Sequence, residues 1–161
     1  MRALDRDARA AVVREAYAAY AAGDPAPLWG LLAPQVTFHV AGDHPLSGDY
    51  RGLEEVQGYL ATIERLNGGP GGATLDTVFA DESGDMVLLE STTRHGRVER
   101  SIGHVLRFEG DRLVELWDNP ADPEAEDRYW RARVPAQQRR HLTEGARPDG
   151  AVPAPRLGSS R

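Results

Sequence analysis

A succession of four strand-like segments in the second half of the chain limits the possible folds more than any other feature. Each segment alternates apolar and polar residues with the period of two that strands require, and turn residues separate the segments. They are predicted at residues 73–80, 85–94, 97–108 and 113–118. Because connections this short join antiparallel neighbours, this half of the chain predicts a meander.

Helical patterns precede these strands. The other predicted elements are helices at residues 4–22, 25–32 and 53–66, a strand at 36–40, a loop at 42–52 and a short terminal helix at 123–133. Three helices followed by a meander cannot form a doubly wound parallel sheet. They must pack on one face of a curved, mostly antiparallel sheet, so the predicted class is α+β. The expected shape is a cone whose closed end is core and whose open end is a pocket.

Composition excludes several kinds of chemistry. The chain of 161 residues, with 40% hydrophobic and 27% charged residues, is typical of one globular domain. It contains no cysteine, which excludes disulfides, thiol nucleophiles and cysteine-ligated zinc or iron–sulfur sites. All 19 basic residues are arginine, so the chain has no lysine for a Schiff base or a P-loop. We predict no cofactor.

Charge is unevenly distributed along the chain. The body is acidic, which argues against a nucleic-acid partner, whereas residues 134–161 are rich in Pro, Gly and Arg. We expect a folded domain at residues 1–133 and a disordered basic tail at 134–161. No apolar run reaches transmembrane length and the N-terminus does not resemble a signal peptide, so we expect a cytoplasmic protein without a membrane partner.

The hairpin at residues 101–118 decides whether two chemically important side chains meet. A two-residue loop would place His104 opposite Trp117 and would mismatch several other pairs. A three-residue loop at residues 110–112 gives chemically matched pairs on every rung. These pairs are Phe108 with Val114, Arg107 with Glu115, Leu106 with Leu116 and His104 with Asp118. We therefore predict that His104 and Asp118 lie side by side at the end of an apolar face.

These two residues are the predicted catalytic pair. In an apolar pocket the pKa of Asp118 would rise, and its carboxylate could take a proton from a carbon next to a carbonyl. His104 could hold Asp118 or donate a hydrogen bond to the developing enolate oxygen. The alternatives are that Asp118 caps the turn before Asn119 and that His104 is a satisfied core histidine.

The pocket wall is predicted from the neighbouring elements. A tight turn at His95-Gly96 would place Val87 opposite His104 and Leu89 opposite Ile102, extending the same inward face. For the two tyrosines among the candidates, packing in the core is the alternative. The predicted substrate contacts are Tyr17, Tyr20, Phe38, Val40, His44, Val87, Leu106 and Leu116.

Two further histidines, His39 and His44, flank the predicted loop. A metal site would need a third ligand at a recognisable spacing, which the sequence lacks, so no metal is predicted. His39 lies on the opposite strand face from Val40, which predicts a surface or interface position. An exposed Trp117 beside Val105 on that outer face predicts a homodimer.

Three stretches, AAYAAGDPAPLWGLLAPQVTFHVAG, HPLSGDYRGLEEVQGYL and GHVLRFEGDRLVELWDNP, resemble the NTF2-like superfamily in its SnoaL-like branch, which includes ketosteroid isomerase-like proteins. The resemblance covers about residues 5–133. In SnoaL-type polyketide cyclases an aspartate on the last strand and a histidine on the strand before it are catalytic, and Asp118 and His104 match these positions. The ketosteroid isomerase tyrosine and base positions carry Ala16 and Val40 here, so the resemblance does not imply steroid isomerisation. Epoxide hydrolase chemistry would need an acid at Ile102.

The resemblance implies a cofactor-independent enzyme that uses general acid/base chemistry on a small, apolar, polyketide-like substrate containing a carbonyl group. Cyclisation, isomerisation and dehydration remain open as the reaction. The alternative function is a non-catalytic small-molecule-binding or assembly module that uses the same pocket.

Overall fold

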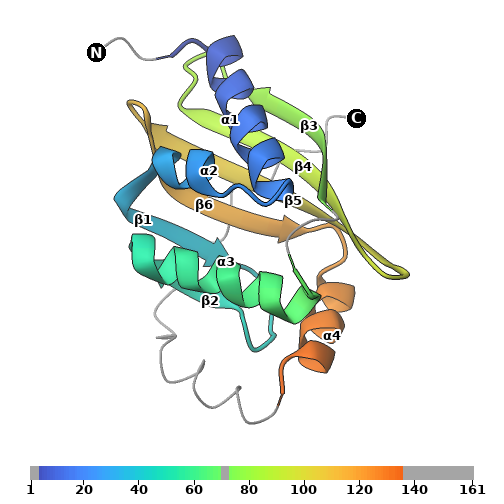
Figure 1. Ribbon diagram of the computed structural model, residues 1–161. Helices are drawn as coiled ribbons and strands as arrows, with labels where there is room; N and C mark the ends of the chain where they lie inside the picture. Colours follow the sequence, from blue (N-terminus) through green and yellow to red (C-terminus); the bar gives the residue numbers. More distant parts are fainter. Residues whose placement is uncertain (1–3, 70–72, 136–161) are drawn as a thin grey trace.

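The computed structural model describes residues 4–69 and 73–135. Its elements follow one another as predicted, with one additional strand (Figure 1). They are α1 (Arg6–Ala21), α2 (Ala26–Leu31), β1 (Leu32–Val40), β2 (Gly48–Arg51), α3 (Leu53–Asn67), β3 (Ala73–Ala80), β4 (Met86–His95), β5 (Val98–Glu109), β6 (Arg112–Pro120) and α4 (Pro123–Arg133).

The six strands form one sheet in the order β2-β1-β6-β5-β4-β3. All neighbouring strands are antiparallel except β1 and β6, which are parallel. The sheet is curved, α1, α2 and α3 lie across one face, and α4 lies at the end where β6 finishes (Figure 1). The predicted α+β class is confirmed, with α4 as the fourth helix. None of the helices in the described ranges is long and apolar enough to span a membrane.

The first half of the sheet corrects two predictions. β1 begins at Leu32 rather than at Val36, and β2 lies within the predicted loop at 42–52. Pro34 falls where the β1–β6 register shifts between Leu32 and Thr37. Because proline has no N–H to donate, it is tolerated at such an irregularity.

The β4–β5 hairpin turns one residue later than predicted. His95 pairs with Val98, so Leu89 faces His104 and Val87 faces Leu106. The predicted partners of Val87 and Leu89 were wrong by two positions. Since side chains alternate with a period of two, this shift leaves each of them on its predicted face.

The β5–β6 hairpin combines both predicted registers. A two-residue turn places Phe108 opposite Leu113, and the register then shifts by one residue, leaving Val114 without a partner. Beyond this bulge His104 faces Asp118, as predicted. The predicted pairing of Phe108 with Val114 was wrong because the strand, rather than the turn, contains the extra residue.

The core fills the space between the helices and the inner face of the sheet. Leu113, which is fully buried, takes the core position predicted for Val114. Val134, the first residue of the predicted tail, is also fully buried in this core, so the folded domain extends past residue 133. Pro135 is exposed, and residues 136–161 of the predicted tail lie outside the described residues.

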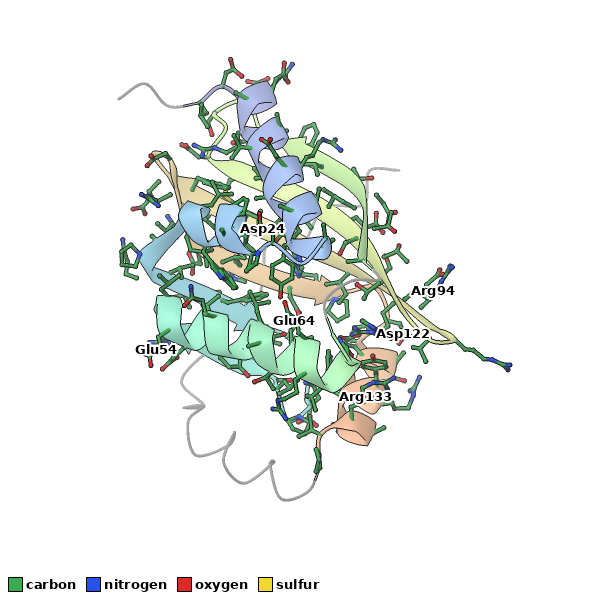
Figure 2. The ribbon with its side chains drawn as sticks, viewed as in Figure 1. Asp24, Glu54, Glu64, Arg94, Asp122 and Arg133 are labelled. Carbon is green, nitrogen blue, oxygen red and sulfur yellow. The ribbon has the colours of Figure 1, made fainter. Side chains whose placement is uncertain are left out.

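Recognisable capping residues mark the end of α3 and the start of α4. The α3 helix ends at Asn67, where Gly68 adopts the left-handed conformation (φ 84°) that favours glycine at helix C-termini. The side chain of Asp122 caps the N-terminus of α4 by accepting a hydrogen bond from Ala125 N–H. Figure 2 shows Asp122 at one end of α4 and Arg133 at the other.

Candidate active site

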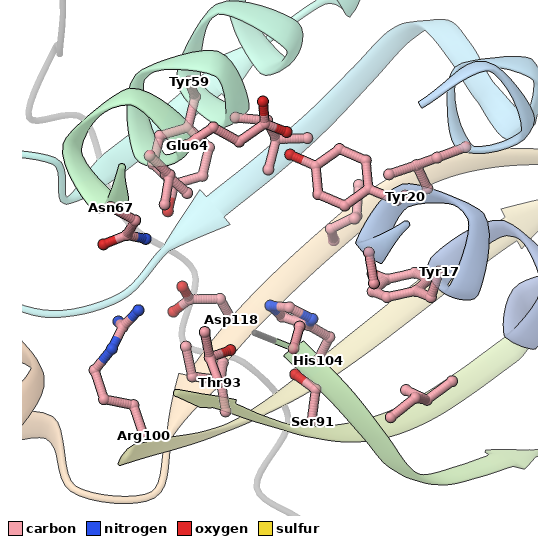
Figure 3. A pocket seen from close by; sticks show the side chains of 18 of the residues that line it. Tyr17, Tyr20, Tyr59, Glu64, Asn67, Ser91, Thr93, Arg100, His104 and Asp118 are labelled. Carbon is pink, nitrogen blue, oxygen red and sulfur yellow. The ribbon is translucent and has the colours of Figure 1, made fainter. Parts of the chain in front are cut away.

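The concave side of the sheet and the helices enclose a cavity of about 600 Å³. Most of its wall is apolar, which is typical of a site for a small organic molecule. Among the described residues, the polar side chains on the wall come from α1, α3, β3, β4, β5, β6 and α4, and Figure 3 shows many of them. They include Tyr17, Tyr20, Tyr59, Glu64, Asn67, Ser91, Thr93, Arg100, His104, Asp118 and Glu126.

Asp118 reaches this cavity from β6 because the bulge turns its side chain to the inner face. The residue is 8% exposed, and one carboxylate oxygen accepts a hydrogen bond from the Ala41 N–H at 3.3 Å. Burial raises the pKa of Asp118 to about 7, and the negative charge of Glu126 also raises it. The Ala41 N–H and the Arg100 charge act in the opposite direction. The carboxyl group is therefore suited to exchanging a proton near neutral pH.

His104 lies beside Asp118 on β5, and both side chains project into the same space (Figure 3). Its ring is placed between Tyr17 and Phe38, with centroid separations of 6.2 Å and 6.0 Å. Burial lowers the pKa of His104 to about 4, so the imidazole is neutral at neutral pH. Its Nδ1 is buried and has no hydrogen-bond partner among the described residues.

No hydrogen bond joins His104 to Asp118 within the described part of the chain. The structure therefore brings the predicted pair together on one wall without showing His104 holding the carboxylate. A neutral imidazole keeps one N–H donor, which leaves His104 able to donate to a bound oxygen atom.

The predicted contact residues divide into two groups. Tyr17, Tyr20, Phe38 and Leu116 are on the cavity wall. The other four are not on the described wall, because each is buried against other parts of the protein.

Val87 and Leu106 face each other in the fully buried core, and Val40 pairs with Gly48 in the β1–β2 ladder. His44 is buried in the loop, where its Nδ1 accepts a hydrogen bond from Leu46 N–H and its ring packs on Trp130 at 6.3 Å. These four side chains are already in contact with protein.

The outer face of the sheet corrects the expectation for Trp117. The side chain is buried, at 8% exposure, and its ring stacks on His39 at 5.2 Å. His39 also hydrogen-bonds to Asp49 at 2.7 Å and to Glu115 at 2.8 Å.

The structure shows no candidate metal site in residues 4–69 and 73–135. No group of three or more histidine, cysteine, aspartate or glutamate side chains in these ranges is placed to hold a metal ion.

The predicted site residues did not include Arg100 or its partners. Arg100 is four residues before His104 on β5, so the alternation of the strand could have placed it on the inner face. Its guanidinium bonds Glu126 of α4 at 2.5 Å and lies over the rings of Tyr129 and Trp130 at 4.0 Å and 4.9 Å. The sequence contains no comparable indication that Glu126, Tyr129 and Trp130 of α4 contact Arg100, because they are distant from it in sequence.

The α3 helix contributes three further polar groups. Tyr59 and Asn67 continue the apolar stripe of this helix at helical spacing, which is the signal that could have identified them. Glu64 lies toward α1, and its carboxylate and the Tyr20 hydroxyl point toward each other (Figure 3). Burial, and then the neighbouring Glu64, raise the pKa of Tyr20.

Known proteins are similar to this chain in sequence and in fold. A sequence model of the SnoaL-like domain matches residues 13–116, more than half of the chain. The chain belongs to the SnoaL-like family. The uncharacterized protein Rv0034 of Mycobacterium tuberculosis is 31% identical over 127 residues, which cover 77% of this chain and 97% of that protein.

Solved structures share the fold of this chain. A Xanthomonas campestris protein of unknown function with a cystatin-like fold is 28% identical, with a TM-score of 0.65 over 76% of this chain and 97% of that one. A steroid delta-isomerase from Pseudomonas aeruginosa (23% identity, TM-score 0.55, 84% and 86% coverage) shares the fold. So does a putative polyketide cyclase from Sinorhizobium meliloti (14% identity, TM-score 0.54, 67% and 93% coverage). At these identities the last two similarities show the fold alone.

Proposed function

We propose that this SnoaL-like protein is a cofactor-independent enzyme that removes a proton from a carbon next to a carbonyl group in a small, apolar, polyketide-like substrate. The observation that carries the proposal is that Asp118 and His104 both line one large, mostly apolar cavity. A carboxylate in such surroundings is less well solvated than in water and is a stronger base.

In the proposed step the substrate C–H bond breaks and its proton moves to an Asp118 carboxylate oxygen. The electron pair of that bond forms a carbon–carbon double bond, and the π pair of the carbonyl group moves onto its oxygen, giving an enolate. The neutral His104 N–H donates a hydrogen bond to this oxygen as its negative charge develops. The enolate then has three possible outcomes. It regains the proton from Asp118 at another carbon, giving isomerisation, or it attacks a second carbonyl within the substrate, whose oxygen takes that proton, giving cyclisation. Otherwise it expels a hydroxyl group, which leaves as water with the proton from Asp118, giving dehydration.

The protonation states of the two groups support this division of roles. A pKa of about 7 lets Asp118 act as a base at neutral pH and return the proton afterwards. A pKa of about 4 keeps His104 neutral over the pH range in which Asp118 titrates. The imidazole therefore keeps one N–H donor throughout that range. We expect kcat/KM to rise with pH up to about 7 and to level off above it.

The test is the Asp118→Asn variant with a substrate identified by screening small carbonyl compounds or the products of neighbouring biosynthetic genes. Removal of a general base should lower kcat by about 10²–10⁴-fold while leaving the melting profile folded and cooperative. A Ser101→Ala variant, in which the side chain lies on the other face of β5, is the matched control. Wild-type turnover by Asp118→Asn would overturn the mechanism, and a bound compound that wild-type protein leaves unaltered would indicate a binding module instead.

A further inference from the structure

The cavity contains a second polar region, built from Arg100 and Asn67. Arg100 and His104 point inward from the same strand, and four residues of strand separate their Cα atoms by about 13 Å. Figure 3 shows Arg100 and Asn67 on one side of the cavity, with His104 and Tyr17 across it. A bound molecule could therefore contact both polar regions at once.

Arg100 is held firmly in this region. Its side chain is 8% exposed, and it is fixed by the bond to Glu126 and by the aromatic rings of Tyr129 and Trp130. Its Nε has no hydrogen-bond partner within the described residues. A guanidinium group has five N–H donors, and its described hydrogen bond is to Glu126. The group is thus a fixed donor with unused capacity.

Asn67 is oriented by its own partner on α4. The Tyr129 hydroxyl donates to Asn67 Oδ1 at 2.7 Å. This bond occupies the amide oxygen and turns the amide nitrogen toward the inside of the cavity, as Figure 3 shows. The NH₂ group of Asn67 is therefore a second donor next to Arg100, and α4 fixes the positions of both.

The charges on the wall define what these donors can bind. Among the described residues of the wall, Arg100 is the one cation, whereas Glu64, Asp118 and Glu126 are carboxyl groups. Glu126 already pairs with Arg100. A carboxylate on the substrate would be a further buried negative charge without a free cation to compensate it, which is unfavourable. A neutral acceptor such as a second carbonyl oxygen has no such cost.

We infer that Arg100 and Asn67 form a binding subsite for an uncharged acceptor oxygen, so that the cavity selects neutral substrates with two separated oxygen functions. This subsite rests on the proposed function for the position of the first carbonyl, at His104. The second oxygen fixes the orientation of the substrate and hence decides which carbon faces Asp118.

The experiment compares nearly isosteric probes by NMR titration of the full chain. The 1,3- and 1,4-diacetylbenzenes carry two carbonyl groups, and 3- and 4-ethylacetophenone carry one. At least one diacetylbenzene should bind about two- to tenfold more tightly than its ethyl counterpart, the gain of one net hydrogen bond. The anionic probe 4-acetylbenzoate should bind no more tightly than 4-ethylacetophenone.

The Asn67→Asp variant keeps the acceptor for Tyr129 and replaces the inward NH₂ donor with an oxygen of similar size. It should lose the diacetylbenzene gain, whereas Asn119→Asp, at the other asparagine of the chain, which is exposed, should retain it. Tyr129→Phe removes the orienting bond without removing the donor and should reduce the gain. A gain that survives Asn67→Asp, no gain or no binding with either diacetylbenzene, or tightest binding of 4-acetylbenzoate would overturn the subsite.

A fourth variant separates this inference from the catalytic proposal. Asp118→Asn leaves Arg100 and Asn67 unchanged and should retain the diacetylbenzene gain. If Asp118→Asn also retains turnover, the proposed mechanism fails while the subsite stands. If turnover is lost but wild-type protein shows no gain, the subsite fails while the mechanism stands.

Discussion

At the scale of the residue, one hydrophobic environment acts on Asp118 and His104 in opposite directions. Burial disfavours the charged form of each, so the pKa of the acid rises to about 7 and that of the base falls to about 4. Both groups are therefore neutral together between these two values. This is the state that binds an apolar substrate at the lowest desolvation cost.

This opposition makes a prediction about stability. The folded pKa of Asp118 lies above its unfolded value of about 3.9, so its contribution to stability is full below pH 4 and is lost as pH rises through 7. Asp118→Asn should therefore become progressively more stable than wild type between pH 4 and pH 7.5, by at most about 4 kcal/mol. Urea unfolding measured across this range tests it.

His104 provides a control of opposite sign. Its folded pKa lies below its unfolded value of about 6.5, so its contribution is full above pH 6.5 and is lost as pH falls toward 4. His104→Gln should therefore gain stability relative to wild type as pH falls. Differences from wild type that do not change with pH in either variant would contradict the assigned protonation states.

At the scale of the element, a single unpaired residue places the candidate base. Leu113 faces the core, so an uninterrupted strand would put Trp117 inside and Asp118 outside. The bulge at Val114 reverses this alternation, and Asp118 faces the cavity. The strand irregularity thus belongs to the site, although it lies four residues away from Asp118.

Arg9 connects elements at the closed end of the cone. It is fully buried on α1, donates through Nε to the Gly84 carbonyl at 3.0 Å and also to the Gly110 carbonyl, and lies over Phe108 at 4.1 Å. These contacts hold the helix to the β3–β4 and β5–β6 turns.

Arg9→Met should lower the free energy of unfolding by about 2 kcal/mol, because two carbonyl groups lose a charged donor. Arg6→Met, at an exposed position on the same helix, should change it by less than about 0.5 kcal/mol. Chemical unfolding of both variants is the measurement. Equal stability of the two would show that the buried arginine does not secure the helix.

At the scale of the whole molecule, α4 is an integral part of the folded domain. Its residues hold Arg100 and Asn67 at the cavity, and Val134 beyond it is part of the core. The end of the folded domain therefore supports both the core and the wall of the candidate site.

Val134→Ala in the full chain should lower the free energy of unfolding by about 2 kcal/mol, since it removes two buried methyl groups. Val98→Ala, at a position 41% exposed on β5, should have an effect below about 0.5 kcal/mol. Thermal unfolding of the pair tests the new domain boundary. A small effect at Val134 would return the boundary to residue 133.

The sequence by itself determined the α+β class, most element positions and the pairing of His104 with Asp118, because strand alternation and helical periodicity are local properties. It did not reveal the bulge, because both hairpin registers satisfied part of the same pattern. Only the tertiary structure decided which further residues line the cavity. Arg100, Asn67 and Glu126 come from separate elements. They meet only because of how these elements pack together, which a local sequence pattern does not predict.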